Sequence, residues 1–233
     1  MPMKQLVACV VLSSAAFVAV AQSFPPPQNV LQLSASGTVE VQQDLLSLSL
    51  TTTREGTDAS AVQSQLKAAL DAALTEARKA ALPGQLDVRT GNFSLYPRYT
   101  RDGKINNWSG SAELVLEGRD FPRITQAAGR IPTMTMGGVS FGLSREQRAK
   151  VEGDAQAMAI ERFKAKAADL AKGFGFSGYT LREVSVNAND QGFMPRPRMM
   201  AMEAKVAQAD MPVPVEAGKT SVVVTVSGSV QLK

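Results

Sequence analysis

The feature that most restricts the fold of this 233-residue chain is the interleaving of strand patterns with two long helical patterns. Residues 31–41, 46–52 and 221–232 place an apolar or small residue at almost every second position, which is typical of strands with one buried face. Residues 60–77 and 144–172 instead repeat apolar residues every three or four positions, which predicts amphipathic helices. The chain is therefore predicted to have an α+β fold.

Short polar signals mark where each helix begins and ends. Ser60 and Ser144 are each followed three residues later by glutamine, as in a capping box, although Asp58 is an alternative N-cap for the first helix. Pro83 and the glycine after it end the first helix. Gly173 is the predicted C-cap of the second helix.

Shorter elements fill the remaining chain, and their order repeats. The sequence predicts further strands and one short helix at 86–95, 108–117, 120–130 (helix), 133–143 and 180–186. An Asp-Gly pair in the loop 99–107 predicts a tight turn. Strand, long helix, strand, strand thus occurs over 46–117 and again over 135–232. We expect one compact domain, in which an antiparallel-rich sheet carries both long helices on one face.

The N-terminal segment predicts export rather than fold. Residues 1–21 combine one basic residue, an apolar stretch and an Ala-Val-Ala sequence, which indicates a signal peptide cleaved after Ala21. A lipobox ending at Cys9 is the alternative, although almost no apolar residues precede it. Residues 22–30 form a Pro-rich spacer, and 31–233 form the predicted domain. The protein is expected in the periplasm, with no transmembrane segment after the signal is removed.

One long segment, 187–218, interrupts the last two predicted strands. It holds four of the twelve prolines and five of the ten methionines, and it has little periodicity, so we expect a mobile excursion from the domain. Thioether sulfur binds Cu(I), so these methionines are candidate metal ligands. Two nearby arginines argue against a metal, because they place positive charge close to any bound cation. The candidate ligands are Met194, Met199, Met200, Met202 and Met211.

The composition excludes several kinds of site. The chain has no histidine and one cysteine, Cys9, which leaves with the signal peptide. A Ser-His-Asp triad, a Cys-His dyad and a His-ligated zinc are therefore excluded within one chain. The 25 basic and 21 acidic residues are scattered, which argues against a nucleic-acid partner. No cofactor is predicted.

Three short motif matches have a structural interpretation. GxSxG at 138–142 needs a histidine base that the chain lacks. GxGxxG at 173–178 closes a helix and enters a strand, the reverse of a dinucleotide-binding motif. The Gly-Lys-Thr at 218–220 has Val213 where a P-loop needs glycine, and a strand follows it.

A Ser-Lys hydrolase is the remote enzymatic alternative, because such a site needs no histidine. Ser64 and Lys67 have the Ser-x-x-Lys spacing, Ser185 precedes Asn187 by two residues, and the Lys-Thr-Ser at 219–221 completes the order that penicillin-recognising enzymes use. Each motif is short, and the chain lacks material for the helical half of such enzymes. We predict no catalytic residue.

The stretch 88–143 and two later segments resemble a known family. The resemblance rests on RTGNFSLYPRY at 89–99, SAELVLE at 111–117, GGVSFGLS at 137–144, KAKAADLAKG at 164–173 and PVPVEAGK at 212–219. These segments resemble the SIMPL-domain family of YggE-like exported proteins, which includes a periplasmic immunogenic protein. The resemblance implies a non-catalytic envelope protein linked to envelope or oxidative stress tolerance. It also implies self-association, because one relative forms a large ring-like oligomer.

We therefore interpret the chain as a periplasmic structural or interaction module. Its partner would be a second copy or another envelope protein, bound through sheet edges, the loop 99–107 or the excursion 187–218. A copper-binding or small-ligand-binding protein is the alternative, and a Ser-Lys hydrolase is the remote one.

Overall fold

A computed structural model describes residues 28–189 and 215–233, so the predicted signal peptide, 1–21, lies outside the described residues. Along the chain the elements are β1 (Val30–Gln42), β2 (Leu45–Gly56), α1 (Ala59–Ala80), β3 (Asp87–Tyr99), β4 (Ile105–Gly118), α2 (Phe121–Gly129), β5 (Thr135–Gly142), α3 (Arg145–Gly173), β6 (Tyr179–Asn189) and β7 (Lys219–Leu232). The helices of the described residues include none that is both long and apolar enough to cross a membrane.

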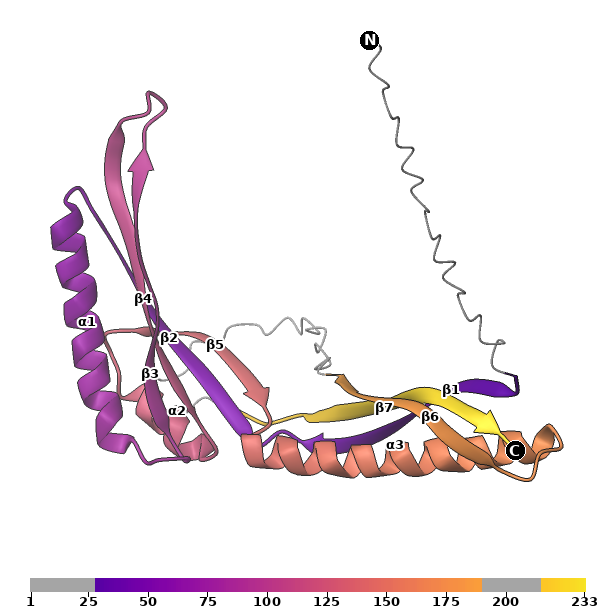
Figure 1. Ribbon diagram of the computed structural model, residues 1–233. Coiled ribbons are helices and arrows are strands. Elements are labelled where there is room, and N and C mark those ends of the chain that lie inside the picture. The colour runs from indigo at the N-terminus through magenta and orange to yellow at the C-terminus, as the bar shows by residue number, and fades with distance from the viewer. Residues whose placement is uncertain (1–27, 190–214) are drawn as a thin grey trace, which may run out of the picture.

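Two antiparallel sheets form two arms that meet at an angle (Figure 1). The α3 arm consists of the sheet β1-β7-β6 and helix α3, which packs on one face of this sheet. We call this face the inner face and the opposite one the outer face. The α1 arm consists of the sheet β3-β4-β2-β5 and helices α1 and α2. The α+β class and the antiparallel strands are confirmed. The expected single sheet is replaced by two, each with its own long helix.

The predicted duplication exists in the topology, but its members differ from the prediction. β2, α1, β3 and β4 form one unit, in which the first strand pairs with the last and the last pairs with the middle strand. β1, α3, β6 and β7 form a second unit with the same pairing. β5, the strand just before α3, pairs with β2 instead of β7. The second unit thus takes its first strand from the start of the chain.

The helix starts agree with the capping signals. Asp58 is the N-cap of α1, and its carboxylate accepts hydrogen bonds from the Ala61 N–H at 2.7 Å and the Ser60 hydroxyl at 2.7 Å. Of the two candidates for this cap, Asp58 is therefore correct. The Ser144 hydroxyl caps α3 as predicted, accepting from the Gln147 N–H at 3.2 Å.

The α3 helix ends at Gly173, the predicted cap, but the glycine that closes it lies two residues further on. Phe174 is the C-cap, and Gly175 adopts the left-handed conformation with φ of +83°. The N–H of Phe176 donates to the Ala171 carbonyl at 2.9 Å, and the N–H of Gly175 donates to the Lys172 carbonyl at 3.0 Å. This is a Schellman motif, which requires glycine at position 175 rather than 173.

Each arm has its own apolar core. In the α3 arm an alanine stripe on α3 faces the buried valines of β7. The helix can lie very close to β1 there, because a Cβ on Gly37 would lie 2.0 Å from the Ala155 carbonyl oxygen. In the α1 arm the leucines of β2 and β4 pack against α1 and α2. The alanine stripe consists of Ala155, Ala159, Ala167 and Ala171, all buried.

The arms are joined at Gln43 and Asp44, where the chain passes from one sheet to the other. The Asp44 carboxylate accepts hydrogen bonds from the Ser144 N–H and hydroxyl, each at 2.7 Å, and lies 3.4 Å from Arg119 Nε. The Gln43 N–H donates to the Gly218 carbonyl at 3.0 Å. The start of α3, the end of β4 and the approach to β7 are thereby fastened to one junction.

Candidate functional site

The structure does not bring the Ser-Lys motifs together. Ser64 is exposed on α1, in one arm, whereas Ser185 and Lys219 lie on β6 and β7 in the other arm (Figure 1). Lys219 Nζ lies 2.8 Å from Glu40 Oε1, and this hydrogen bond, with the attraction between the two charges, raises the pKa of Lys219. A raised pKa keeps the amine protonated and unsuited to act as a general base.

The other short motifs occupy ordinary structural positions, as predicted. Residues 138–142 lie in strand β5, where the Ser140 hydroxyl donates to the Ser47 carbonyl at 3.5 Å. The motif 173–178 contains the Schellman turn after α3. Lys219 begins strand β7, so no helix follows the Gly-Lys-Thr sequence.

Metal binding through methionine stays a prediction. Met194, Met199, Met200, Met202 and Met211 all lie in 190–214, outside the described residues. Residues 187–189 of the predicted excursion belong to β6, and Val215 packs against the core of the α1 arm. Within the described ranges, no three histidine, cysteine, aspartate or glutamate side chains are grouped to hold a metal ion.

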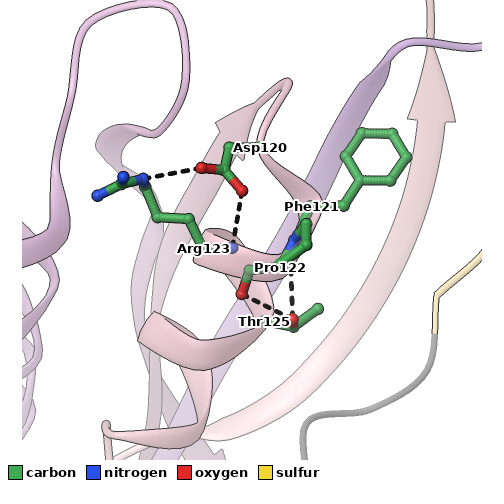
Figure 2. Close-up of polar contacts among 5 residues, drawn as sticks. All are labelled: Asp120, Phe121, Pro122, Arg123 and Thr125. Atoms are coloured by element: carbon green, nitrogen blue, oxygen red, sulfur yellow. Dashed lines mark hydrogen bonds and ion pairs between the residues drawn. The ribbon is translucent and has the colours of Figure 1, made fainter.

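A hollow of about 360 Å³ lies between the end of α1 and helix α2, and its acidic residue is a helix cap. Figure 2 shows that one Asp120 oxygen accepts from the Arg123 N–H at 3.0 Å, and the other accepts from Arg123 Nε at 3.0 Å. These two hydrogen bonds, the backbone one foremost, lower the pKa of Asp120. Thr125 is equally engaged, since its hydroxyl lies 3.1 Å from the Phe121 and Pro122 carbonyls. Asp120 therefore serves to start α2.

The outer face of the α3-arm sheet carries a broad, polar hollow of about 460 Å³. Small hydroxyl side chains dominate its lining, and Glu183 is its only charged residue. Its hydroxyl-bearing residues are Ser34, Ser185, Ser227 and Ser229. With one charge and no apolar enclosure, this face lacks the features of a small-molecule site.

The sheet edges differ in how well they are covered, beginning with β1. The N–H of Leu232 donates to the Asn29 carbonyl, so odd-numbered residues of β1 direct their backbone groups toward β7 and even-numbered ones toward the free edge. Arg162 donates to the Ser36 carbonyl at 2.8 Å and Lys166 to the Ser34 carbonyl at 3.1 Å. Two cations of α3 thus occupy two of the carbonyl acceptors in the middle of the β1 edge.

The two edges of the α1-arm sheet are interrupted. β3 contains Pro97 and has a register shift between Thr90 and Phe93, where the Asn92 N–H donates to the Glu113 carboxylate at 3.0 Å. β5 is eight residues long, includes Gly137 and the glycine after it, and pairs with β2 through another register shift. Proline, bulges and short length are the usual protections against strand addition.

β6 is the long edge strand without these protections along most of its length. It runs for eleven residues with neither proline nor glycine, and its only register shift lies near its start, between Leu181 and Glu183. Three apolar side chains on its inner face are uncovered, with exposed fractions of 53% for Leu181, 44% for Val184 and 45% for Val186. No described segment pairs with its free side.

The second exposed feature is the hairpin tip, residues 96–107, which joins the end of β3 to the start of β4. β2 pairs with β4 only from Trp108 onward, so the tip is a two-stranded ribbon that projects past the start of α1 (Figure 1). The exposed fractions are 64% for Tyr96, 63% for Tyr99 and 52% for Ile105. The sequence predicts that the first strand ends at Leu95 and that the second begins at Trp108. In the structure β3 continues to Tyr99 and β4 begins at Ile105, so the loop is shorter than the predicted 99–107.

The comparison with protein families agrees with the sequence resemblance. A model of the SIMPL family, described as a protein of unknown function (DUF541), matches residues 31–230. A comparison with curated proteins finds no match. Because the family match covers most of the chain, the protein belongs to the SIMPL family.

Proposed function

We propose that this SIMPL protein is an exported, non-catalytic envelope protein that acts by self-association through the free edge of β6. The uncovered row formed by Leu181, Val184 and Val186 carries the proposal. Export rests on the sequence of residues 1–21, and a role in envelope or oxidative stress tolerance rests on the family resemblance.

The backbone of β6 suits strand addition as well as its side chains do. The paired N–H and C=O groups of Gly178 and Lys233 place the odd-numbered residues of β7 toward β6. In the register of β6 these residues face Glu183, Ser185 and Asn187, so the backbone groups of Val184 and Val186 point to the free edge. A second strand would gain main-chain hydrogen bonds and cover both valines.

A second copy of β6 would fit this edge. In an antiparallel pair centred on Ser185, Val184 of one copy lies opposite Val186 of the other, on the α3 side of both sheets. Glu183 then lies opposite Asn187, so no like charges face each other there.

The test is the mass in solution of the chain from Gln22 onward, measured by light scattering after size exclusion. The unsubstituted chain is expected to form a defined oligomer, and Val184→Lys is expected to dissociate it, because an inward-pointing charge blocks strand addition. The matched control is Val139→Lys, a similarly exposed valine on the β5 edge. A monomeric unsubstituted chain, or dissociation by the control alone, would contradict the proposal.

The copper-binding alternative keeps its basis in the sequence. It predicts that the same chain takes up Cu(I) in a fixed ratio and that deletion of residues 190–211 abolishes this uptake. Absence of stoichiometric uptake would end this alternative without affecting the self-association proposal.

A further inference from the structure

We propose that the hairpin tip, residues 96–107, docks on the surface of an anionic phospholipid membrane. The proposal is independent of self-association through β6, which lies in the other arm (Figure 1). It rests on the aromatic residues of the tip, its charge and its projection from the body of the protein.

Within the described part of the chain, no residue covers the aromatic and apolar side chains of the tip. Tyr99 lies opposite Ile105 in the ladder, so both side chains share one face of the ribbon. Tyr96 follows Leu95, whose side chain packs toward α1, and it therefore projects from the opposite face. Every residue from Arg98 to Asn106 is exposed. Tyrosine rings on both faces suit the membrane interface, where an apolar ring and a polar hydroxyl are both accommodated.

The charge of the tip complements an anionic surface. Residues 96–107 contain three basic residues and one acidic residue, which leaves a net charge of +2. Arg98 is paired with Glu55 at 3.1 Å, toward the base of the ribbon. Arg101 and Lys104 lie in the turn itself, at the apex, where a membrane surface would be met first. Basic residues beside interfacial aromatics are the usual combination for binding anionic lipid.

The shape of the tip favours a membrane over a folded protein partner. A stable protein interface buries about 800 Å² on each partner, which requires a broad face. The tip is a narrow, two-stranded ribbon with exposed side chains on both of its faces. A flat protein surface would therefore cover only one face of the ribbon. A lipid headgroup layer can enclose both faces at once.

The experiment is co-sedimentation of the chain from Gln22 onward with vesicles. Residues 1–21 are omitted because their apolar segment would bind lipid by itself, and all described contacts are retained. Vesicles of phosphatidylethanolamine with phosphatidylglycerol are compared with vesicles of phosphatidylcholine alone, at low and high salt. Binding is expected only to the anionic vesicles and is expected to weaken with salt.

Variants of the tip separate its two contributions. Arg101→Gln with Lys104→Gln should weaken binding by roughly fivefold for each charge removed. The matched control, Arg145→Gln with Lys150→Gln on α3, removes the same charge elsewhere and should bind as the unsubstituted chain does. Tyr96→Ser with Tyr99→Ser should also reduce binding, although it leaves the net charge unchanged.

A second readout follows the tip directly. Trp108, the only tryptophan, lies at the base of the tip and packs against α1, so the readout uses Tyr99→Trp combined with Trp108→Phe. Lipids brominated in the upper acyl chain should quench the tryptophan fluorescence of this variant. No binding to anionic vesicles, equal binding by the tip and α3 variants, or no quenching in the bound state would each overturn the proposal.

Discussion

Replacing Gly37 by alanine should strongly destabilise the packing of β1 against α3. An added Cβ would lie 2.0 Å from the Ala155 carbonyl oxygen and 2.8 Å from the Ala159 nitrogen. Both contacts involve backbone of α3, so no side chain can rotate away. Either the helix moves by an ångström or more, or β1 bends away from it.

The expected cost follows from this geometry. Overpacking a core costs about 1–3 kcal/mol, and a clash with helix backbone belongs at the upper end, about 3 kcal/mol. Total stabilities of about 5–15 kcal/mol make such a loss easy to measure. The matched control is Gly153→Ala on α3, where nothing lies within 4 Å of the added Cβ. It should stabilise by about 0.5–1 kcal/mol, because alanine favours helix over glycine.

Urea unfolding measures both variants with two probes. Far-ultraviolet circular dichroism follows all elements, whereas fluorescence of Trp108 follows the α1 arm. Gly37→Ala should lower the free energy of unfolding seen by circular dichroism. A value within about 0.5 kcal/mol of the unsubstituted protein would refute the inferred approach of β1 to α3, since that is the range of neutral surface changes.

Two further predictions concern the junction and the helix caps. Asp44→Ala removes two hydrogen bonds to Ser144 and the ion pair with Arg119, and it should cost about 3 kcal/mol in the same urea assay, given the strength of hydrogen bonds to charged groups. The exposed Asp71→Ala is its control; an equal effect of both would contradict the role of the junction. Asp58 and Asp120 have pKa values below the ordinary 3.8, because hydrogen bonds chiefly from Ser60 and from the Arg123 N–H, respectively, favour their ionised forms. The stability that these two ionised carboxylates contribute is fully present above their unfolded-state pKa. It is lost as the pH falls through their folded-state pKa. The midpoint temperature of thermal unfolding should therefore decrease as the pH is lowered below about 4. The decrease should be smaller for Asp58→Asn with Asp120→Asn, because asparagine keeps a capping oxygen but does not titrate. The same pH profile in this variant and in the unsubstituted protein would count against this account.

Local periodicity explains why so much of the fold was predictable. Side chains return to the same face every 3.6 residues in a helix and every two residues in a strand. The spacing of apolar residues therefore predicts a helix at 144–172 and a strand at 221–232. Asp58 and Ser144 are recognisable N-caps because a cap bonds to backbone three residues away. The prediction that Gly173 caps α3 was wrong. Gly175 lies about as close to the end of the helical apolar repeat, so the repeat alone does not choose between the two glycines. Which of the two glycines closes the helix depends on where the turn leads.

The sequence by itself determined the element types, their order, the absence of histidine chemistry and the family. Only the tertiary structure decided which strands are neighbours. Every alternating strand has an apolar face, so β5 and β1 are equally suited by pattern to pair with β7, and contacts between residues as distant as Gly37 and Val224 select β1. The unprotected β6 edge and the projecting hairpin tip follow from that choice, because exposure is a property of neighbours that the pattern of a strand does not contain.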